Sequence, residues 1–206
     1  MKRTGIMGGT FNPVHIAHLI LAEHALEQFA LDEIMFLPSR RPAYKPAEEI
    51  LPDAVRFQLL QLATAENPAF YVSDLELKRE GNTYTADTML QLKQLEPDTD
   101  FYFILGGDSL MKFERWYHPE IILANAHLLA TTRGNGTDTA KQELVYQKAE
   151  ELNRRFHSDI QVFTTPLMEI SSTEIRKRLQ NGQSVRYLMP EPVRSCLEDY
   201  VGVKQA

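Results

Sequence analysis

Two histidines three residues apart follow a glycine pair in the string GGTFNPVHIAH. Gly8 and Gly9 let the backbone come close to a ligand, and their amides, with that of Thr10, are able to point at phosphate oxygens. His15 and His18 share one face of a first helical turn, where the helix dipole favours anions and imidazoles donate hydrogen bonds to phosphate. The string therefore predicts a clamp for a phosphate whose charge grows during transfer.

Other interpretations of this string are open. A glycine pair before a helix is common, and histidines at this spacing also occur in packing or in metal sites, where a third ligand would come from elsewhere in the fold. The string is not GxxxxGK[ST], which disfavours a P-loop nucleotidase. GxGxxG is missing after the first predicted strand, which excludes an NAD-dependent dehydrogenase.

A second string with chemical potential, ISSTEIRKRL, spans Ile170–Leu179. Ser171, with a glutamate three residues later, forms a capping box, so a well-capped helix with solvated cations would explain the segment by itself. Three hydroxyls nevertheless gather at the helix N-terminus, from Ser171, Ser172 and Thr173, with Arg176 one turn later. Amides, hydroxyls and a planar cation together suit a pyrophosphate, so we predict a second phosphate site here.

Short apolar runs alternate with longer amphipathic ones, and this pattern predicts the elements that hold both strings. It is typical of an α/β fold, Rossmann-like and doubly wound, with a mostly parallel sheet and helices on both faces. Ligands of such sheets bind at the carboxyl ends of the strands. The predicted strands are Thr4–Met7, Glu33–Leu37, Phe70–Val72, Phe101–Leu105, His127–Thr131 and Ile160–Thr164. The predicted helices are His15–Phe29, Asp53–Glu66 with Asp53 as N-cap, Thr85–Leu95, Thr139–Phe156, Ser172–Gln180 and a terminal helix ending near Tyr200, and Arg40–Pro52 is a predicted loop.

Composition sets the class of protein. With 206 residues, 43% of them hydrophobic, we expect one domain over residues 1–206 with a sizeable core. The net charge of -6 argues against nucleic acid as the main partner. The single Cys196 permits no intrachain disulfide and is expected to lie partly buried in the terminal helix. No apolar signal segment is visible, and Ile121–Ala130 is too short to span a bilayer, so we expect a cytoplasmic protein without a membrane partner; a homo-oligomer stays open.

The two strings, about 160 residues apart, resemble the paired motifs of the nucleotidylyltransferase superfamily. Ala17 stands where the first motif, usually written HxGH, has glycine. Three more segments, FLPSRRPAYKP, NTYTADTM and ILGGDSL followed by WYHPE, narrow the resemblance to the bacterial nicotinate mononucleotide adenylyltransferases, over roughly residues 3–200. Tyr44 stands where that family often has histidine.

The resemblance implies transfer of AMP from ATP to nicotinic acid mononucleotide with release of pyrophosphate. It implies Mg²⁺ held mainly by the ATP phosphates, without a metal site built from protein side chains. The residues it places at ATP are His15, His18 and Arg176 as catalytic groups, with Gly8, Gly9, Thr10, Phe11, Gly106, Asp108, Arg133, Ile170, Ser171, Ser172 and Thr173. The residues it places at the mononucleotide are Lys45, Tyr84, Thr85, Trp116 and Tyr117.

Structural interpretations and rival functions stay beside this one. Trp116 would fit a core, Asp108 would fit the cap of a helix starting near Ser109, and Tyr84 and Thr85 would fit the start of a helix. A sister adenylyltransferase acting on phosphopantetheine is one rival, against which stands the WYH segment, suited to stacking a flat ring. A non-catalytic nucleotide-binding protein on the same fold is another, against which stand the two histidines and the arginine.

Overall fold

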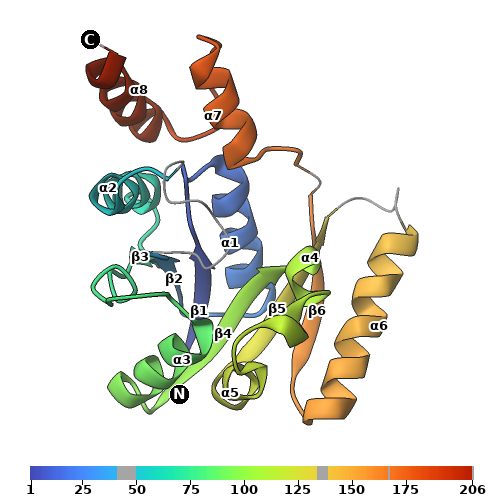
Figure 1. The fold of residues 1–206 in the computed structure, drawn as a ribbon. Helices are drawn as coiled ribbons and strands as arrows, with labels where there is room; N and C mark the ends of the chain where they lie inside the picture. Colours follow the sequence, from blue (N-terminus) through green and yellow to red (C-terminus); the bar gives the residue numbers. More distant parts are fainter. Residues whose placement is uncertain (41–49, 134–138, 167, 206) are drawn as a thin grey trace.

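The sheet has its strands in the order that places a ligand crevice at its centre. The computed structural model describes residues 1–40, 50–133, 139–166 and 168–205, and in this part of the chain six strands form one sheet, ordered β3-β2-β1-β4-β5-β6 (Figure 1). Every neighbouring pair is parallel. This is the order of dinucleotide-binding Rossmann folds, so the predicted fold class is confirmed. The strands are β1 Lys2–Gly9, β2 Glu33–Pro38, β3 Phe70–Val72, β4 Thr99–Gly106, β5 His127–Arg133 and β6 Ile160–Thr165.

Helices cover both faces of this sheet. The helical elements are α1 Ile16–Gln28, α2 Asp53–Thr64, α3 Thr85–Leu95, α4 Gly107–Leu110, the 3₁₀ turn η2 Phe113–Arg115, α5 Pro119–Asn125, α6 Thr139–Phe156, α7 Ser172–Gln180 and α8 Glu191–Gln205. Buried residues of α3, α5 and α6 join one core, and those of α1, α2, α7 and α8 join the other. No helix in the described ranges is both long and apolar enough to cross a membrane.

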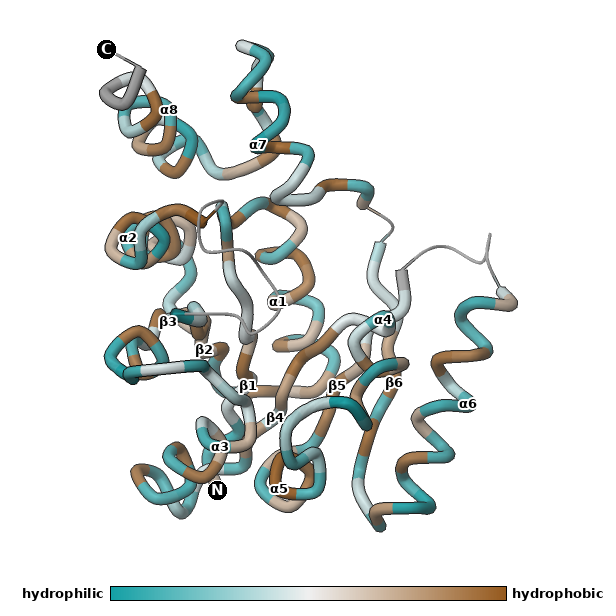
Figure 2. The backbone as a smooth tube through the Cα atoms, viewed as in Figure 1, coloured by the Kyte–Doolittle hydropathy of each residue, from teal (hydrophilic) through white to brown (hydrophobic). Residues whose placement is uncertain are grey.

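The same strands contribute to both cores, because alternate residues along each strand belong to one core or the other. Successive side chains of a strand point to opposite faces, so each apolar strand feeds both layers. The layer under α3, α5 and α6 takes Ile6, Met35, Leu37, Phe101, Phe103, Leu105, Leu128 and Ala130. The layer under α1, α2, α7 and α8 takes Met7, Ile34, Phe36, Tyr102, Ile104 and Leu129. The central strands are accordingly among the most hydrophobic parts of the tube in Figure 2.

Most predicted elements are found, and four have the predicted bounds to the residue: Phe70–Val72, Thr85–Leu95, Thr139–Phe156 and Ser172–Gln180. Cys196 is half-buried against the core under α8, which confirms its expected role. The predicted cap of α2 is wrong: Pro52 holds the N-cap position, and the Asp53 carboxylate contacts Arg56 instead. Most of the predicted loop Arg40–Pro52 lies outside the described residues.

The segment between β4 and β5 holds three short elements, α4, η2 and α5, of which the sequence suggested only a helix starting near Ser109. The suggested helix cap at Asp108 is wrong, because α4 begins at Gly107 with Gly106 as N-cap. Pro119 begins α5, where its missing N–H costs nothing. These turns hold Trp116 and Tyr117 over the carboxyl end of β4.

Packing of α6 gives a first test. Leu152 is fully buried against the sheet, whereas Leu144 on the same helix is 53% exposed. Leu152→Ala should lower the free energy of unfolding by about 2–5 kcal/mol, because it leaves a cavity. Leu144→Ala should change it by less than about 0.5 kcal/mol. Urea unfolding followed by circular dichroism measures both, and equal losses would show that α6 is not packed as described.

Candidate functional site

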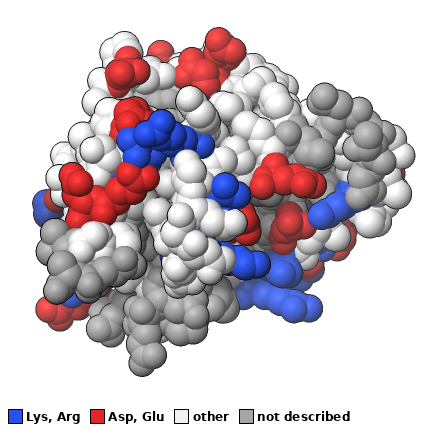
Figure 3. Space-filling view, turned by 90° about the horizontal axis from the view of Figure 1, so that it is seen from above, with Lys and Arg blue, Asp and Glu red and all other residues white. Residues whose placement is uncertain are grey.

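Two cavities open at the carboxyl end of the sheet: the larger at the ends of β1 and β4, where the strand order reverses, and the smaller at the ends of β5 and β6. The smaller, about 150 Å³, is lined by His15, Ala17, His18, Leu21, Thr131, Thr165, Pro166, Met168, Ile170, Ser171 and Ser172. The larger, about 350 Å³, is lined by Gly8, Gly9, Thr10, His18, Tyr84, Thr85, Gly106, Trp116, Tyr117 and neighbouring residues. Figure 3 looks onto this end of the sheet, where cationic and anionic side chains are intermixed.

The segment from Gly8 to Pro13 leads from β1 toward α1, and its residues Gly8, Gly9 and Thr10 line the larger cavity. A Cβ on Gly8 would lie 3.2 Å from the Phe103 ring, so the strand end packs tightly there. Phe11 adopts a left-handed φ of 46°, which is unusual for a residue with a side chain. Its ring is buried against Phe36 and His18, at centroid distances of 5.9 and 5.0 Å, and this packing holds the conformation. Phe11 therefore brings only its backbone to the site.

His15 and His18 lie at the start of α1, as predicted, and their rings stack at a centroid distance of 3.7 Å. The Nδ1 atom of His18 accepts a hydrogen bond from the backbone N–H of His15 at 3.2 Å. Because a backbone N–H only donates, Nδ1 must be the acceptor, which puts the proton of the neutral imidazole on Nε2. His18 lines both cavities, so this Nε2–H donor belongs to the boundary between them.

The second string docks directly on the first. The Ser172 hydroxyl donates to the Pro13 carbonyl and the Arg176 guanidinium donates to the Asn12 carbonyl, both at 2.8 Å. The Ser171 hydroxyl accepts from the backbone N–H of Glu174 at 3.2 Å, so the capping role is present too. Capping and ligand binding are compatible, because the smaller cavity is lined by Ile170, Ser171 and Ser172 together with His15 and His18.

Aromatic side chains form one wall of the larger cavity. Trp116 is half-buried, perpendicular to the Phe103 ring at a centroid distance of 6.1 Å. The rings of Tyr84 and Tyr117 lie 4.5 Å apart. Tyr84 is the N-cap of α3 and Thr85 its first residue, which leaves the first amides of that helix without partners inside it. The cavity thus combines flat apolar surfaces with a helix N-terminus.

Some predicted site residues lie outside both cavity linings. Asp108 is exposed and forms an ion pair with Lys141 at 3.4 Å. Thr173 is exposed on α7, and Arg176 reaches the loop rather than a cavity wall. Arg133 ends β5, and its side chain lies outside the described residues, as does the whole of Lys45.

Two buried charged residues near the site were missed by the sequence-based interpretation. Glu76 lines the larger cavity with only 6% of its surface exposed, and Arg56 is fully buried behind the loop. Burial raises the pKa of the Glu76 carboxyl, while a hydrogen bond from Thr88 and the charge of Arg79 act in the opposite direction. Neither residue stands in a motif, and only the tertiary structure distinguishes them from solvated positions of a helix or loop.

Metal-binding groups are sparse in the part of the chain that the structure describes. No three His, Cys, Asp or Glu side chains there are grouped so as to hold a metal ion. The described lining of the smaller cavity offers imidazoles and hydroxyls and no carboxylate. This donor set fits a metal ion carried by a ligand's own phosphates better than one held by the protein.

Comparison with known proteins gives one consistent family. A protein-family model described as cytidylyltransferase-like matches residues 6–178. A protein of Lachnoclostridium phytofermentans described as a probable nicotinate-nucleotide adenylyltransferase is 52% identical over 197 residues, covering 96% of each chain. One of Geobacter metallireducens with the same description is 41% identical over 202 residues, covering 93% of each chain.

A solved structure shares the fold. The nicotinic acid mononucleotide adenylyltransferase of Plasmodium falciparum, complexed with NaAD, superposes with a TM-score of 0.78 at 20% identity. The match covers 97% of this chain and 96% of that one. At this identity, the likeness concerns the arrangement of strands and helices.

The buried Glu76 generates a test of the site's electrostatics. A folded-state pKa above the ordinary value of 4.5 means that folding favours the protonated carboxyl, so stability falls as pH rises through that window. Glu76→Gln keeps an oxygen for Thr88 but has no proton to lose. The stability of the variant relative to the wild type should therefore rise as the pH is raised above the ordinary carboxyl pKa of 4.5 in denaturant titrations. Parallel stability curves for the two proteins would contradict it.

Proposed function

The chain belongs to the nicotinate-nucleotide adenylyltransferase family, and on this premise we propose that it joins nicotinic acid mononucleotide to the AMP half of ATP at the two-cavity cleft. The mononucleotide phosphate is already an anionic nucleophile near neutral pH. One of its oxygens attacks the α-phosphorus of ATP, the bond to the β-phosphate oxygen breaks, and pyrophosphate leaves. No covalent enzyme intermediate is needed, so catalysis consists of alignment and neutralisation of charge.

One observation carries the proposal: His18 lines both cavities. Two substrates that meet at His18 would bring their reacting phosphates together beside its Nε2–H. A donor held there by the bond from the His15 backbone is already oriented for the charge that develops on the transferring phosphate.

The smaller cavity suits the leaving pyrophosphate. It lies between the N-termini of α1 and α7, so two helix dipoles and their first amides favour an anion. We assign His15, Ser171 and Ser172 to the phosphates, with Ile170 and Thr173 beside them. Arg176 donates one N–H to the Asn12 carbonyl, and its remaining N–H groups are assigned to the same phosphates.

The larger cavity suits the pyridine nucleotide. Trp116 offers a flat face for the ring, and the amides at Thr85 and Tyr117 are assigned to the nicotinate carboxylate. The buried Thr83 hydroxyl also lines this cavity and has no hydrogen-bond partner among the described residues, so a polar ligand group would complete it. Lys45 is assigned to the mononucleotide phosphate.

The remaining assignments concern the adenosine and the metal ion. Gly8, Gly9, Thr10 and the Phe11 backbone are assigned to nucleotide phosphates, and the adenosine is assigned to Gly106, Asp108 and Arg133. Mg²⁺, carried on the ATP phosphates, would supply further neutralisation of their charge. One domain, a cytoplasmic location and homo-oligomerisation stay predictions.

The proposed reaction is tested directly. Purified protein with Mg²⁺, ATP and nicotinic acid mononucleotide should release pyrophosphate and form the adenine dinucleotide, followed by chromatography and a coupled phosphate assay. Phosphopantetheine is the matched acceptor and should give neither product. If phosphopantetheine is turned over and nicotinic acid mononucleotide is not, the assignment is overturned. If neither acceptor is turned over, the result favours a nucleotide-binding protein without this activity.

A pair of substitutions separates the two roles of His18. His18→Asn places an amide oxygen near the position of Nδ1, which keeps an acceptor for the His15 N–H but removes the donor facing the cavities. It should lower kcat about 10²–10³-fold, the cost of losing one such donor.

The matched variant His18→Gln keeps a donor near the position of Nε2 and loses the acceptor, so it should retain more of kcat while losing about 1 kcal/mol of stability. Steady-state kinetics and thermal melts measure both variants. Near-normal kcat in His18→Asn would show that His18 serves only the helix start.

A further inference from the structure

Three residues of the loop between β1 and α1 have their backbone carbonyls held by side chains from outside the loop. The carbonyls of Asn12 and Pro13 accept from Arg176 and Ser172, and that of Thr10 accepts from Arg56 at 2.7 Å. In a trans peptide the C=O and the next N–H point in opposite directions. A carbonyl directed at the buried Arg56 therefore turns the Phe11 amide toward the opposite side, where a phosphate is assigned.

Arg56 is the most constrained of these donors. Its side chain has 0% exposure, and its three nitrogens are divided among the carbonyls of Leu51 and Thr10 and the carboxylate of Asp53, at 3.1, 2.7 and 2.6 Å. The backbone N–H of Leu51 in turn donates to Asn12 Oδ1 at 2.9 Å. Burying a guanidinium is costly, and a well-packed apolar residue would often stabilise a core as well. Arg56 instead specifies where the loop lies.

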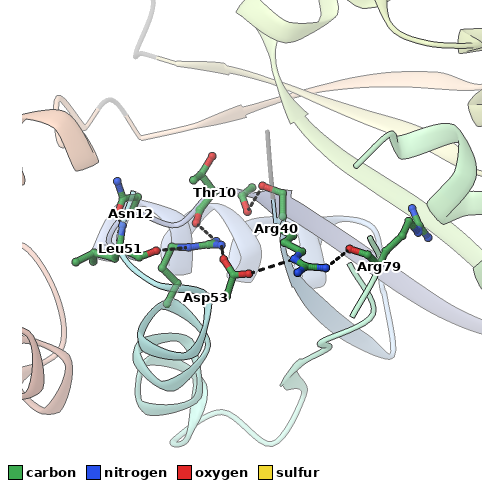
Figure 4. A network of polar contacts seen from close by, with 9 residues as sticks. Thr10, Asn12, Arg40, Leu51, Asp53 and Arg79 are labelled. Atoms are coloured by element: carbon green, nitrogen blue, oxygen red, sulfur yellow. Dashed lines mark hydrogen bonds and ion pairs between the residues drawn. The ribbon is translucent and has the colours of Figure 1, made fainter. Parts of the chain in front are cut away.

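The contacts continue from Arg56 to the opposite wall of the larger cavity. Figure 4 shows Asp53, Arg40 and Arg79 in this line of contacts. Asp53 also pairs with Arg40 at 3.8 Å, and Arg40 donates to the Arg79 carbonyl at 2.8 Å.

The Arg79 side chain donates to Thr88 at 3.0 Å, and the Thr88 hydroxyl contacts the Glu76 carboxylate and the Tyr84 carbonyl. Thr10 and Glu76 both line the larger cavity, so this line of contacts spans it.

We propose that Arg56, Asp53 and Arg40 form a brace that sets the separation between the loop after β1 and the N-terminus of α3. The proposal rests on the proposed function, in which the first wall holds phosphate and the second holds the nicotinate carboxylate. Arg56 is then a positioning residue: it touches no substrate but fixes the alignment of the two reacting groups. Alignment errors of about 1 Å are enough to slow such a reaction by about 10²-fold.

The test compares substitutions along the brace with matched controls. Arg56→Lys keeps the charge, but its single nitrogen cannot reach the three acceptors that the three guanidinium nitrogens reach. It should lower kcat about 10–100-fold while each KM changes less than about threefold. Leu152→Ala is the stability control, because it weakens the fold far from the cleft. Measured well below both melting temperatures, Leu152→Ala should keep the wild-type kcat. Equal kcat in Arg56→Lys and the wild type would overturn the proposal.

A second pair covers the case in which Arg56→Lys does not fold. Arg40 is 37% exposed, so Arg40→Gln should fold and still lower kcat about 3–10-fold. Lys78→Gln removes an exposed ion pair with Asp74 in the same segment as Arg79 and should leave kcat unchanged. The double variant Arg40→Gln/Asp53→Asn should lose no more kcat than the more damaging of its two single variants, because both substitutions break the same line of contacts. Additive losses, or equal kcat in Arg40→Gln and Lys78→Gln, would overturn the brace.

Failure of the proposed function is separable from failure of the brace. If the wild type releases pyrophosphate with a different phosphorylated acceptor, the kcat ratios between variants and wild type are measured with that acceptor. The brace then stands or falls on those ratios, whichever acceptor is used.

Discussion

A backbone that presents its amides to an anion must find donors for its carbonyls elsewhere, and the loop between β1 and α1 is built on this requirement. Buried carbonyls without partners are costly, and here side chains from other elements supply the donors. Arg56 comes from α2, and Ser172 and Arg176 come from α7. The strand order brings both helices to the same face of the sheet as α1, and so the conformation of this loop depends on the topology of the fold.

This dependence changes how the second string is understood. Ser171 caps α7, and Ser172 and Arg176 of the same helix hold the first string, so capping is only one of the segment's structural roles. The cleft also has unequal halves. One cavity lies between two helix N-termini and suits charge, while the other is walled by Trp116 and a pair of tyrosines and suits a flat ring. His18 stands where these environments meet.

The sequence predicted much of this arrangement because its signals are local. Short apolar runs located the strands, and the spacing of His15 and His18 placed them on one turn. Residues whose roles depend on distant partners were not predictable. Aspartate is a residue type typical of helix caps, but the Asp53 carboxylate contacts Arg56 and Arg40 instead. Glu76 stands in no sequence pattern that marks it as buried. The short helical elements after β4 were largely missed because they have only four, three and seven residues, too few for a hydrophobic period to be detected.

The docking of α7 on the loop has a consequence for synthesis in the cell. The ribosome synthesises the loop after β1 first, and Ser172 and Arg176, which hold its carbonyls, follow about 160 residues later. At about 5–20 residues per second, the nascent chain spends many seconds with its first string exposed and its last clamp not yet made. An incomplete chain thus lacks the geometry to consume ATP, and competence arrives only when the end of the fold closes on its beginning.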